Sequence, residues 1–124
     1  RMIMKNNEQK KWIRLGLFIN KERQKIGLSL RKFAEKVGVT HVAISHIEKG
    51  RVEAKKETLI KIASILNYDK DTLLAKAAKL NDDVENMLSE NSETAAIFFR
   101  SASKLSDDQL KKVTEQMKKM TKDN

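Results

Sequence analysis

Apolar side chains recur along this chain at intervals of three and four residues, which is the spacing of one face of an α-helix. The first segment with this spacing covers residues 8–25. Its apolar face is formed by Trp12, Leu15, Ile19 and Ile26 and is widened by Leu17 and Phe18. Gly27 follows and can adopt the left-handed conformation that ends many helices. The pattern predicts an amphipathic helix whose tryptophan packs in a core or an interface.

Two short helices are predicted next, over residues 30–37 and 41–49. Ser29 and Thr40 precede them, and a hydroxyl at this position can accept a hydrogen bond from a backbone N–H of the first helical turn. A glycine follows each segment. Hydroxyl residues before a helix and glycine after it are start and stop signals, so both boundaries are expected to be sharp.

Two further helices are predicted over residues 56–66 and from Asp69 to about Lys79. The apolar face of the first of them consists of Leu59, Ile62, Ala63 and Leu66. Asn67 can end that helix because asparagine tolerates the left-handed conformation. With the three helices before them, they predict a five-helix domain over residues 8–79.

The remaining residues predict a helical extension over residues 80–121. Helices are expected over residues 82–89, over residues 93–104 and after Ser106, which has capping-box spacing to Gln109. The apolar positions of the last helix are Leu110, Val113, Met117 and Met120. Their spacing of three, four and three residues is typical of a narrow coiled-coil seam. The predicted fold class is therefore all-α.

Residues 30–49 have the features of a helix-turn-helix. Ala34 is small enough for two helices to cross closely, and Gly38 can supply the positive backbone angle of the turn. The positions expected to face inward are Phe33, Val37, Val39, Ile44 and Ile47. The positions expected to face outward are Thr40, His41, Val42, Ser45 and His46. A helix with an apolar inner face and a polar outer face fits the major groove of DNA.

Four short motifs follow one another in order between residues 13 and 75. They are an arginine ahead of the G-L-S start at residues 27–29, the A-x-x-x-G step of residues 34–38, the I-S-x-I-E-x-G ending of residues 44–50 and the T-L-x-K-I-A helix of residues 58–63. Each motif is common alone, but together they resemble the phage repressor/Cro-type helix-turn-helix domain of the Xre family. The resemblance implies a five-helix lambda-repressor-like domain whose third helix enters the major groove of double-stranded DNA.

The resemblance also implies roles for individual residues. His41, Val42 and His46 fall at base-reading positions, and Arg23 and Glu48 fall at the positions of a structural ion pair that ties the first helix to the end of the third. The residues placed to contact DNA phosphates are Thr40, Ser45, Arg31, Lys32, Arg51, Lys55 and Lys56.

The roles of three of these positions, or of residues next to them, remain open. Leu30 stands where many phage repressors have a glutamine that contacts phosphate. Leucine cannot make this contact, so Arg31 or Lys32 would have to replace it. Val42 could meet a thymine methyl group or pack partly inside the protein. His41 and His46 could contact DNA or remain solvated. If they contact DNA, affinity should rise as the pH falls through the range in which an unperturbed histidine titrates, near about 6.5.

Charge is distributed unevenly along the chain, whose net charge is +9. Residues 1–80 hold 19 Lys and Arg against 8 Asp and Glu, and residues 81–124 hold 7 against 9. The excess in the first part favours nucleic acid as a partner. Its basic residues are spread over several helices and form no dense tract for a membrane surface. No apolar run approaches the length of a membrane span, so we expect a soluble, cytoplasmic protein.

The sequence lacks the residue clusters that catalysis and metal binding require. There is no cysteine and therefore no disulfide or thiolate metal site. The only two histidines, His41 and His46, do not lie on one strip of a helix, so a shared metal site is not expected. No phosphate-binding glycine loop and no nucleophile–base pair can be identified. We therefore expect neither an enzyme nor a cofactor.

The last two predicted helices carry apolar side chains that a monomer would expose. These are Phe98, Phe99, Leu110, Val113, Met117 and Met120. A second copy of the chain could cover them, and folding back on earlier helices of the same chain is the alternative. The two phenylalanines are adjacent and are expected to point in different directions, one into its own subunit and the other across an interface.

Together these features predict a sequence-specific DNA-binding transcription regulator, a repressor, that binds an inverted-repeat operator as a homodimer. Its two recognition helices would lie about 34 Å apart, one turn of DNA, or a multiple of it. The alternative is an antitoxin-type or adaptor protein. Its main partner would be another protein docked on the acidic C-terminal part, and its DNA binding would serve autoregulation.

Overall fold

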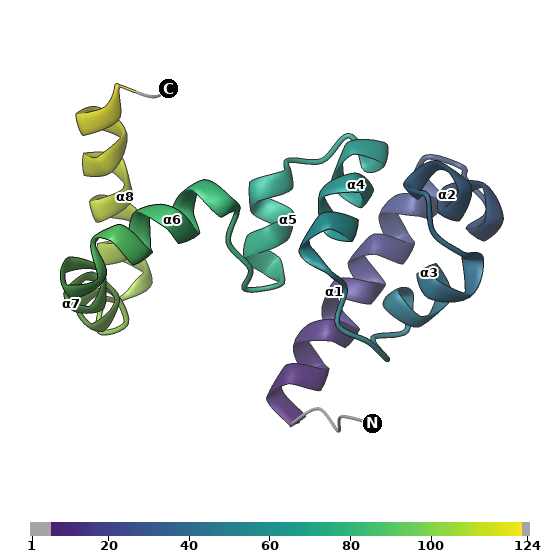
Figure 1. The fold of residues 1–124 in the computed structure, drawn as a ribbon, viewed down its shortest axis with the longest axis horizontal. Helices are drawn as coiled ribbons and strands as arrows, with labels where there is room; N and C mark the ends of the chain where they lie inside the picture. Colours follow the sequence, from purple (N-terminus) through teal and green to yellow (C-terminus); the bar gives the residue numbers. More distant parts are fainter. Residues whose placement is uncertain (1–5, 123–124) are drawn as a thin grey trace. The chain divides into compact units, whose positions relative to one another are not determined.

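The computed structural model describes residues 6–122, and within that range the chain forms α-helices and no strands (Figure 1). The helices are α1 (Asn6–Lys25), α2 (Leu30–Val37), α3 (His41–Glu48), α4 (Lys56–Leu66), α5 (Lys70–Lys76), α6 (Asp82–Glu90), α7 (Ser92–Ala102) and α8 (Asp107–Thr121). The all-α prediction is confirmed.

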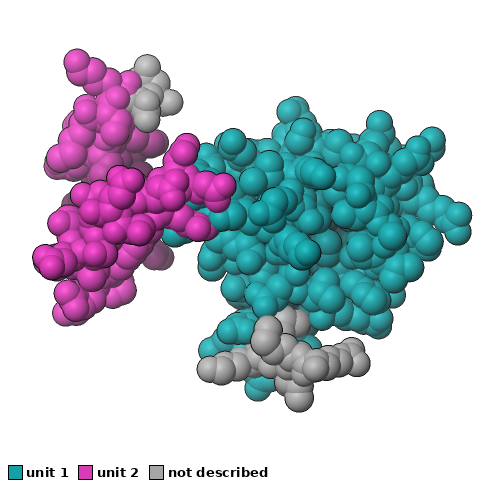
Figure 2. All heavy atoms as spheres, viewed as in Figure 1, with its two compact units in different colours: residues 1–81 teal, residues 82–124 magenta. Residues whose placement is uncertain are grey.

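The chain divides into two compact units between Asn81 and Asp82, which Figure 2 shows in different colours. The N-terminal unit contains α1–α5, and the C-terminal unit contains α6–α8. Each unit is described by itself below.

One hydrophobic core holds the five helices of the N-terminal unit together. Its largest fully buried side chains are Trp12 and Ile19 from α1, Phe33 and Val37 from α2, Ile44 from α3, Leu59 and Ile62 from α4, and Leu73 and Leu74 from α5. In this unit α1 packs against α3, α2 packs against α3 and α4, and α4 packs against α5. Because α2 and α3 both contribute to this core, burial of apolar surface fixes the angle between them.

The predicted capping residues determine where the helices begin. The Ser29 hydroxyl accepts a hydrogen bond from the Lys32 N–H at 3.1 Å, and the Thr40 hydroxyl accepts one from the Ala43 N–H at 3.1 Å. At the start of α8, Ser106 and Gln109 form both hydrogen bonds of the capping box. Each pair satisfies donors that the first turn of a helix leaves without a partner, so these predicted starts are confirmed.

The turn between α2 and α3 depends on Gly38. Its φ is +91°, a conformation that a side chain disfavours. In this conformation its N–H donates to the Ala34 carbonyl at 2.8 Å, and the Val39 N–H donates to the same carbonyl at 3.0 Å. The glycine therefore ends α2 and lets the chain reverse within three residues, as the sequence predicts.

Three of the differences between the structure and the predicted helices concern the N-terminal unit's side-chain burial and the end of α5. Leu17 is 62% exposed instead of widening the core face, because it lies two residues from Leu15 and therefore about 200° around the helix. Ile26 is 45% exposed because it follows the end of α1. Helix α5 ends at Lys76 rather than near Lys79, since Ala78 has a φ of +55°.

The helices of the C-terminal unit bury no side chain completely. Phe98 and Phe99 are 45% and 49% exposed, and their rings touch edge to face with centroids 5.5 Å apart. The expectation that they diverge, with one packed inside its own subunit, is wrong. On a short helix with few neighbours, the two rings pack on each other, because each can cover part of the other's apolar surface.

The apolar seam of α8 is also exposed. Leu110 is 48%, Val113 is 36%, Met117 is 46% and Met120 is 79% exposed. Within the C-terminal unit, therefore, α6 and α7 leave these side chains largely accessible. Between residues 6 and 122, no helix combines the length and apolar character that crossing a membrane requires.

Candidate nucleic-acid interface

One side of α3 anchors the helix and the other is accessible. Ile44 and Ile47 are buried in the core of the N-terminal unit. On the other side, His41 and Val42 are exposed, with Val42 at 50%, and His46 is half-buried. The structure therefore leaves all three predicted base-reading side chains accessible to solvent, and His46 is the least accessible of them.

A surface groove of about 640 Å³ runs between α2 and α3 and brings together side chains from both helices. Arg31 of α2 lines it together with Thr40, His41 and Val42, which begin α3. Glu35 also lines this groove and was not identified from the sequence. Its carboxylate opposes the positive charge that Arg31 brings to the same groove.

The starts of α2 and α3 present polar groups that suit phosphate. Thr40 is exposed, and its hydroxyl accepts the capping hydrogen bond while keeping its own O–H to donate. The positive end of the helix dipole adds to this preference for an anion. Arg31 and Lys32 are exposed in the first turn of α2. Leu30 is half-buried and packs against the core, so it contributes no polar contact at this place.

The loop that follows α3 continues the positive charge. Arg51 and Lys55 are exposed, and Lys56 is half-buried at the start of α4. The Arg51 N–H donates to the His46 carbonyl at 3.0 Å, which holds the beginning of the loop against the end of α3. Ser45, also predicted to meet phosphate, is half-buried in a different groove, which Leu17 and Lys49 also line.

A network around Glu48 fixes the C-terminal end of α3. The Glu48 side chain is 6% exposed and forms an ion pair with Arg23 at 2.7 Å. Arg23 donates through Nε at 2.7 Å and through Nη2 at 3.1 Å, the two-pronged geometry that suits guanidinium and carboxylate. Its Nη1 donates to the Leu28 carbonyl at 2.8 Å, so one side chain joins α1, α3 and the loop before α2.

Asn20 belongs to the same network. Its Nδ2 donates to Glu48 Oε1 at 2.7 Å, and Gln24 Nε2 donates to Asn20 Oδ1 at 2.7 Å. The sequence analysis did not identify Asn20. Its position three residues before Arg23, on the same face of α1, is the signal that could have done so.

Helices α1 and α3 also meet at the level of their backbones. A Cβ atom added to Gly16 would lie 2.4 Å from the Glu48 carbonyl oxygen and 2.5 Å from that of Ile47. A Cβ atom added to Gly50 would lie 2.5 Å from the Ile13 Cα. All three distances are far below van der Waals contact, so only glycine permits this approach. The sequence analysis did not identify Gly16; a glycine in the middle of an otherwise regular helix is the signal that could have done so.

Among residues 6–122, no three His, Asp or Glu side chains lie close enough together to hold a metal ion. The interface is thus built from basic, polar and apolar side chains around α3.

The comparisons with known proteins agree with this geometry. The family described as HTH_3, helix-turn-helix, matches residues 19–73. The restriction-modification controller protein C.AhdI from Aeromonas hydrophila has a TM-score of 0.52 at 19% identity, over 55% of this chain and 99% of that one. An HTH_3 family transcriptional regulator from Vibrio cholerae has a TM-score of 0.49 at 28% identity, over 55% of this chain and 38% of that one. No curated protein matches the chain.

The matched segment runs from α1 into α5 and includes all of α2, α3 and α4. The likeness to C.AhdI extends over the whole of that protein and shows the same fold. The predicted lambda-repressor-like fold is therefore confirmed. Residues 19–73 of this chain form a helix-turn-helix domain of the Xre-type HTH_3 family.

Proposed function

We propose that this protein is a sequence-specific DNA-binding transcription regulator, acting as a repressor, whose helix α3 enters the major groove. The observation that carries this proposal is the two-sided character of α3. Its inner side is fixed by the core and by the Glu48 network, and its outer side holds His41 and Val42 in the open. A rigid helix with an accessible polar face, flanked by basic side chains, suits recognition of base edges.

Phosphate and base contacts have different roles in this proposal. Arg51 and Lys55 after α3, with Arg31 and Lys32 in α2, supply affinity that depends on salt and not on sequence. The two histidines and Val42 supply discrimination among bases, through imidazole nitrogens and through contact with a thymine methyl group.

We expect His46→Ala and Lys55→Ala to weaken DNA binding in different ways. The first should lower affinity by about 1–3 kcal/mol for the preferred sequence and relax specificity at one operator position. The second should weaken binding to all sequences alike and reduce the salt slope by about one, because one phosphate contact is lost. Selection of bound DNA from a random pool, followed by mobility-shift titrations, measures both effects.

Lys70→Ala is the matched control, because Lys70 is an exposed lysine on α5 rather than beside α3. It should bind the selected DNA as the unaltered chain does. Equal weakening of every sequence by both His46→Ala and Lys55→Ala would contradict the base-reading role. A pool that yields no consensus would contradict sequence-specific binding altogether.

We also propose that the regulator is a homodimer assembled through the C-terminal unit and that its operator is an inverted repeat. The apolar seam of α8 and the rings of Phe98 and Phe99 support this, since each of these residues is between 36% and 79% exposed. A unit without a buried residue gains little from its own packing, so a partner surface is the natural source of further burial. If the dimer binds DNA symmetrically, the consensus sequence selected from the random pool should have two-fold symmetry.

Met117→Lys should break this dimer. A lysine in the middle of the seam would place an ammonium group in an apolar interface, which we expect to weaken association at least about a hundredfold. The control is Glu115→Gln, which changes the net charge equally but lies on the opposite face of α8. Sedimentation of the full chain at micromolar concentration measures both variants. An unaltered chain that is monomeric would contradict the dimer and favour a different protein as the partner.

A further inference from the structure

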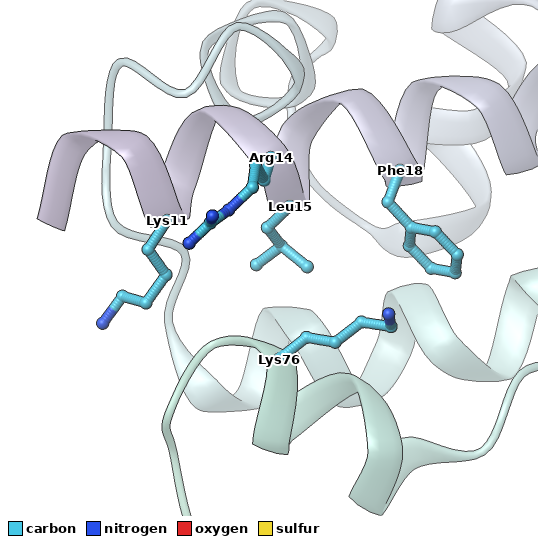
Figure 3. Close-up of a pocket in the computed structure, with 5 residues that line it drawn as sticks. All are labelled: Lys11, Arg14, Leu15, Phe18 and Lys76. Atoms are coloured by element: carbon cyan, nitrogen blue, oxygen red, sulfur yellow. The ribbon is translucent and has the colours of Figure 1, made fainter. Parts of the chain in front are cut away.

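A second site lies between α1 and α5. A cavity of about 200 Å³ is lined by Lys11, Arg14, Leu15 and Phe18 of α1 and by Lys76 of α5 (Figure 3). Leu15 is buried and Phe18 is half-buried, so the inner part of the cavity is apolar. Three basic side chains and no carboxylate complete the lining. We propose that this cavity binds a small amphipathic anion, with one apolar body and one carboxylate or phosphate group.

The basic side chains of the cavity are not neutralised by neighbouring acids. Within residues 6–122, none of Lys11, Arg14 and Lys76 forms an ion pair with a carboxylate, in contrast to Arg23, which pairs with Glu48, and Lys25, which pairs with Glu22. Positive charges gathered around an apolar concavity attract a counter-charge, and the low polarity of the cavity wall strengthens that attraction.

An aromatic ring rather than an acid holds Lys76 in place. Its Nζ lies 4.7 Å from the centroid of the Phe18 ring, and Figure 3 shows its side chain extended toward that ring. The ring of Phe18 is held in turn by an edge-to-face contact with Tyr68 at 5.0 Å. A cation over a ring face keeps its N–H donors, so the ammonium group of Lys76 can still bind an anion.

The size of the cavity limits the ligand. A cavity of about 150 Å³ accepts benzene, so 200 Å³ holds one ring or a short aliphatic chain with its charged group toward solvent. A whole nucleotide would not fit inside. The proposed ligand is therefore a carboxylate or a phosphate monoester that carries either one small aromatic ring or a short aliphatic chain.

The cavity is separate from the proposed DNA surface. Helix α5 packs against α4, whereas α3 packs against α1 and α2 (Figure 1). None of the residues proposed to contact DNA lines the cavity. Binding of a small anion here does not depend on the proposed DNA function and can be tested without DNA.

Trp12 provides the readout for this test. It is the only tryptophan, and the ammonium groups of Lys11 and Lys79 lie 5.1 and 5.7 Å from its ring centroid. An anion that draws Lys11 toward the cavity should therefore change the emission of Trp12. Benzoate is the first probe, with phenyl phosphate as the second, and the full chain is titrated with each while emission is excited at wavelengths the probes do not absorb.

We expect saturable binding of benzoate with a dissociation constant of about 1 mM, as the size of the ligand implies. Benzamide has the same shape without the charge, and acetate has the charge without the ring. Both should bind at least about tenfold more weakly than benzoate, because benzamide lacks the charged group and acetate lacks the apolar ring. If phenyl phosphate binds more tightly than benzoate, the ligand of the cavity is a phosphate monoester. If benzoate binds more tightly, the ligand is a carboxylate.

Lys76→Gln should weaken benzoate binding about tenfold, and Lys70→Gln on the same helix should leave it unchanged. Equal thermal midpoints of the two variants exclude loss of folding as the cause. The proposal is overturned if benzamide binds as tightly as benzoate, if Lys76→Gln binds as Lys70→Gln does, or if benzoate causes no saturable change up to about 10 mM.

Discussion

Replacing Glu48 with alanine is expected to lower the free energy of unfolding by about 3–5 kcal/mol. The side chains of Glu48 and Arg23 are only 6% and 12% exposed, so the substitution would leave a nearly buried guanidinium without its counter-charge. Asn20 would lose its hydrogen bond as well. Small domains unfold with a total of only about 5–15 kcal/mol, so the loss would be a large share of the whole. Urea denaturation followed by circular dichroism measures it.

A double substitution distinguishes the loss of the Arg23–Glu48 attraction from the cost of leaving the Arg23 guanidinium buried without a counter-charge. Arg23→Met with Glu48→Leu removes both charges and keeps apolar volume, and such replacements of ion pairs are often close to neutral. We therefore expect the double variant to be more stable than Glu48→Ala alone. If the two were equally unstable, the network would act mainly through its hydrogen bonds to Asn20 and to the Leu28 carbonyl.

Replacing Gly16 with alanine should destabilise the N-terminal unit by about 2–3 kcal/mol, although alanine is the better helix former by about 1 kcal/mol. The added methyl group would lie 2.4 Å from a backbone carbonyl oxygen of α3, and a backbone cannot move aside as a flexible side chain can. Helix α1 would have to separate from α3 and open the core beneath both. Chemical denaturation measures the stability, and mobility shift measures DNA affinity, which should fall as well.

Gly27→Ala is the comparison for this variant. Gly27 has a φ of +75° and open space around the position where a Cβ atom would lie. Its replacement should cost about 1–2 kcal/mol through backbone strain alone, without disturbing the contact of α1 with α3. A Gly16→Ala variant as stable as the unaltered chain would contradict the close approach of the two helices.

Local signals made the helix-turn-helix predictable. Ser29 and Thr40 cap the helices that they precede, and Gly38 supplies the turn, because these effects operate within four residues of each other. The apolar positions of α2, α3 and α4 lie in the core because a short helix has only one face to bury. The Arg23–Glu48 pair could be predicted only from the family resemblance that several motifs in order carry. Its partners are 25 residues apart, so no local signal connects them.

Other features depended on tertiary geometry that periodicity does not carry. The exposure of Leu17, by contrast, follows from helical spacing, because two residues place it about 200° around the helix from Leu15. The early end of α5 depends on a left-handed alanine at position 78, a residue type that gives no such signal. The cavity beside Lys76 was not predicted either, because it forms only when α5 is placed next to α1.

The close contact through Gly16 and Gly50 has a consequence for how the specificity of such a protein can change. The residues that fix the pose of α3 lie on its inner side and at its end, and those that we propose to read bases lie on its accessible side. Substitutions at His41, Val42 or His46 therefore leave the pose intact and cost little stability. Under the proposed function, such a domain would be retargeted to a new DNA sequence one side chain at a time, and its outer face would be a practical starting point for designed DNA readers.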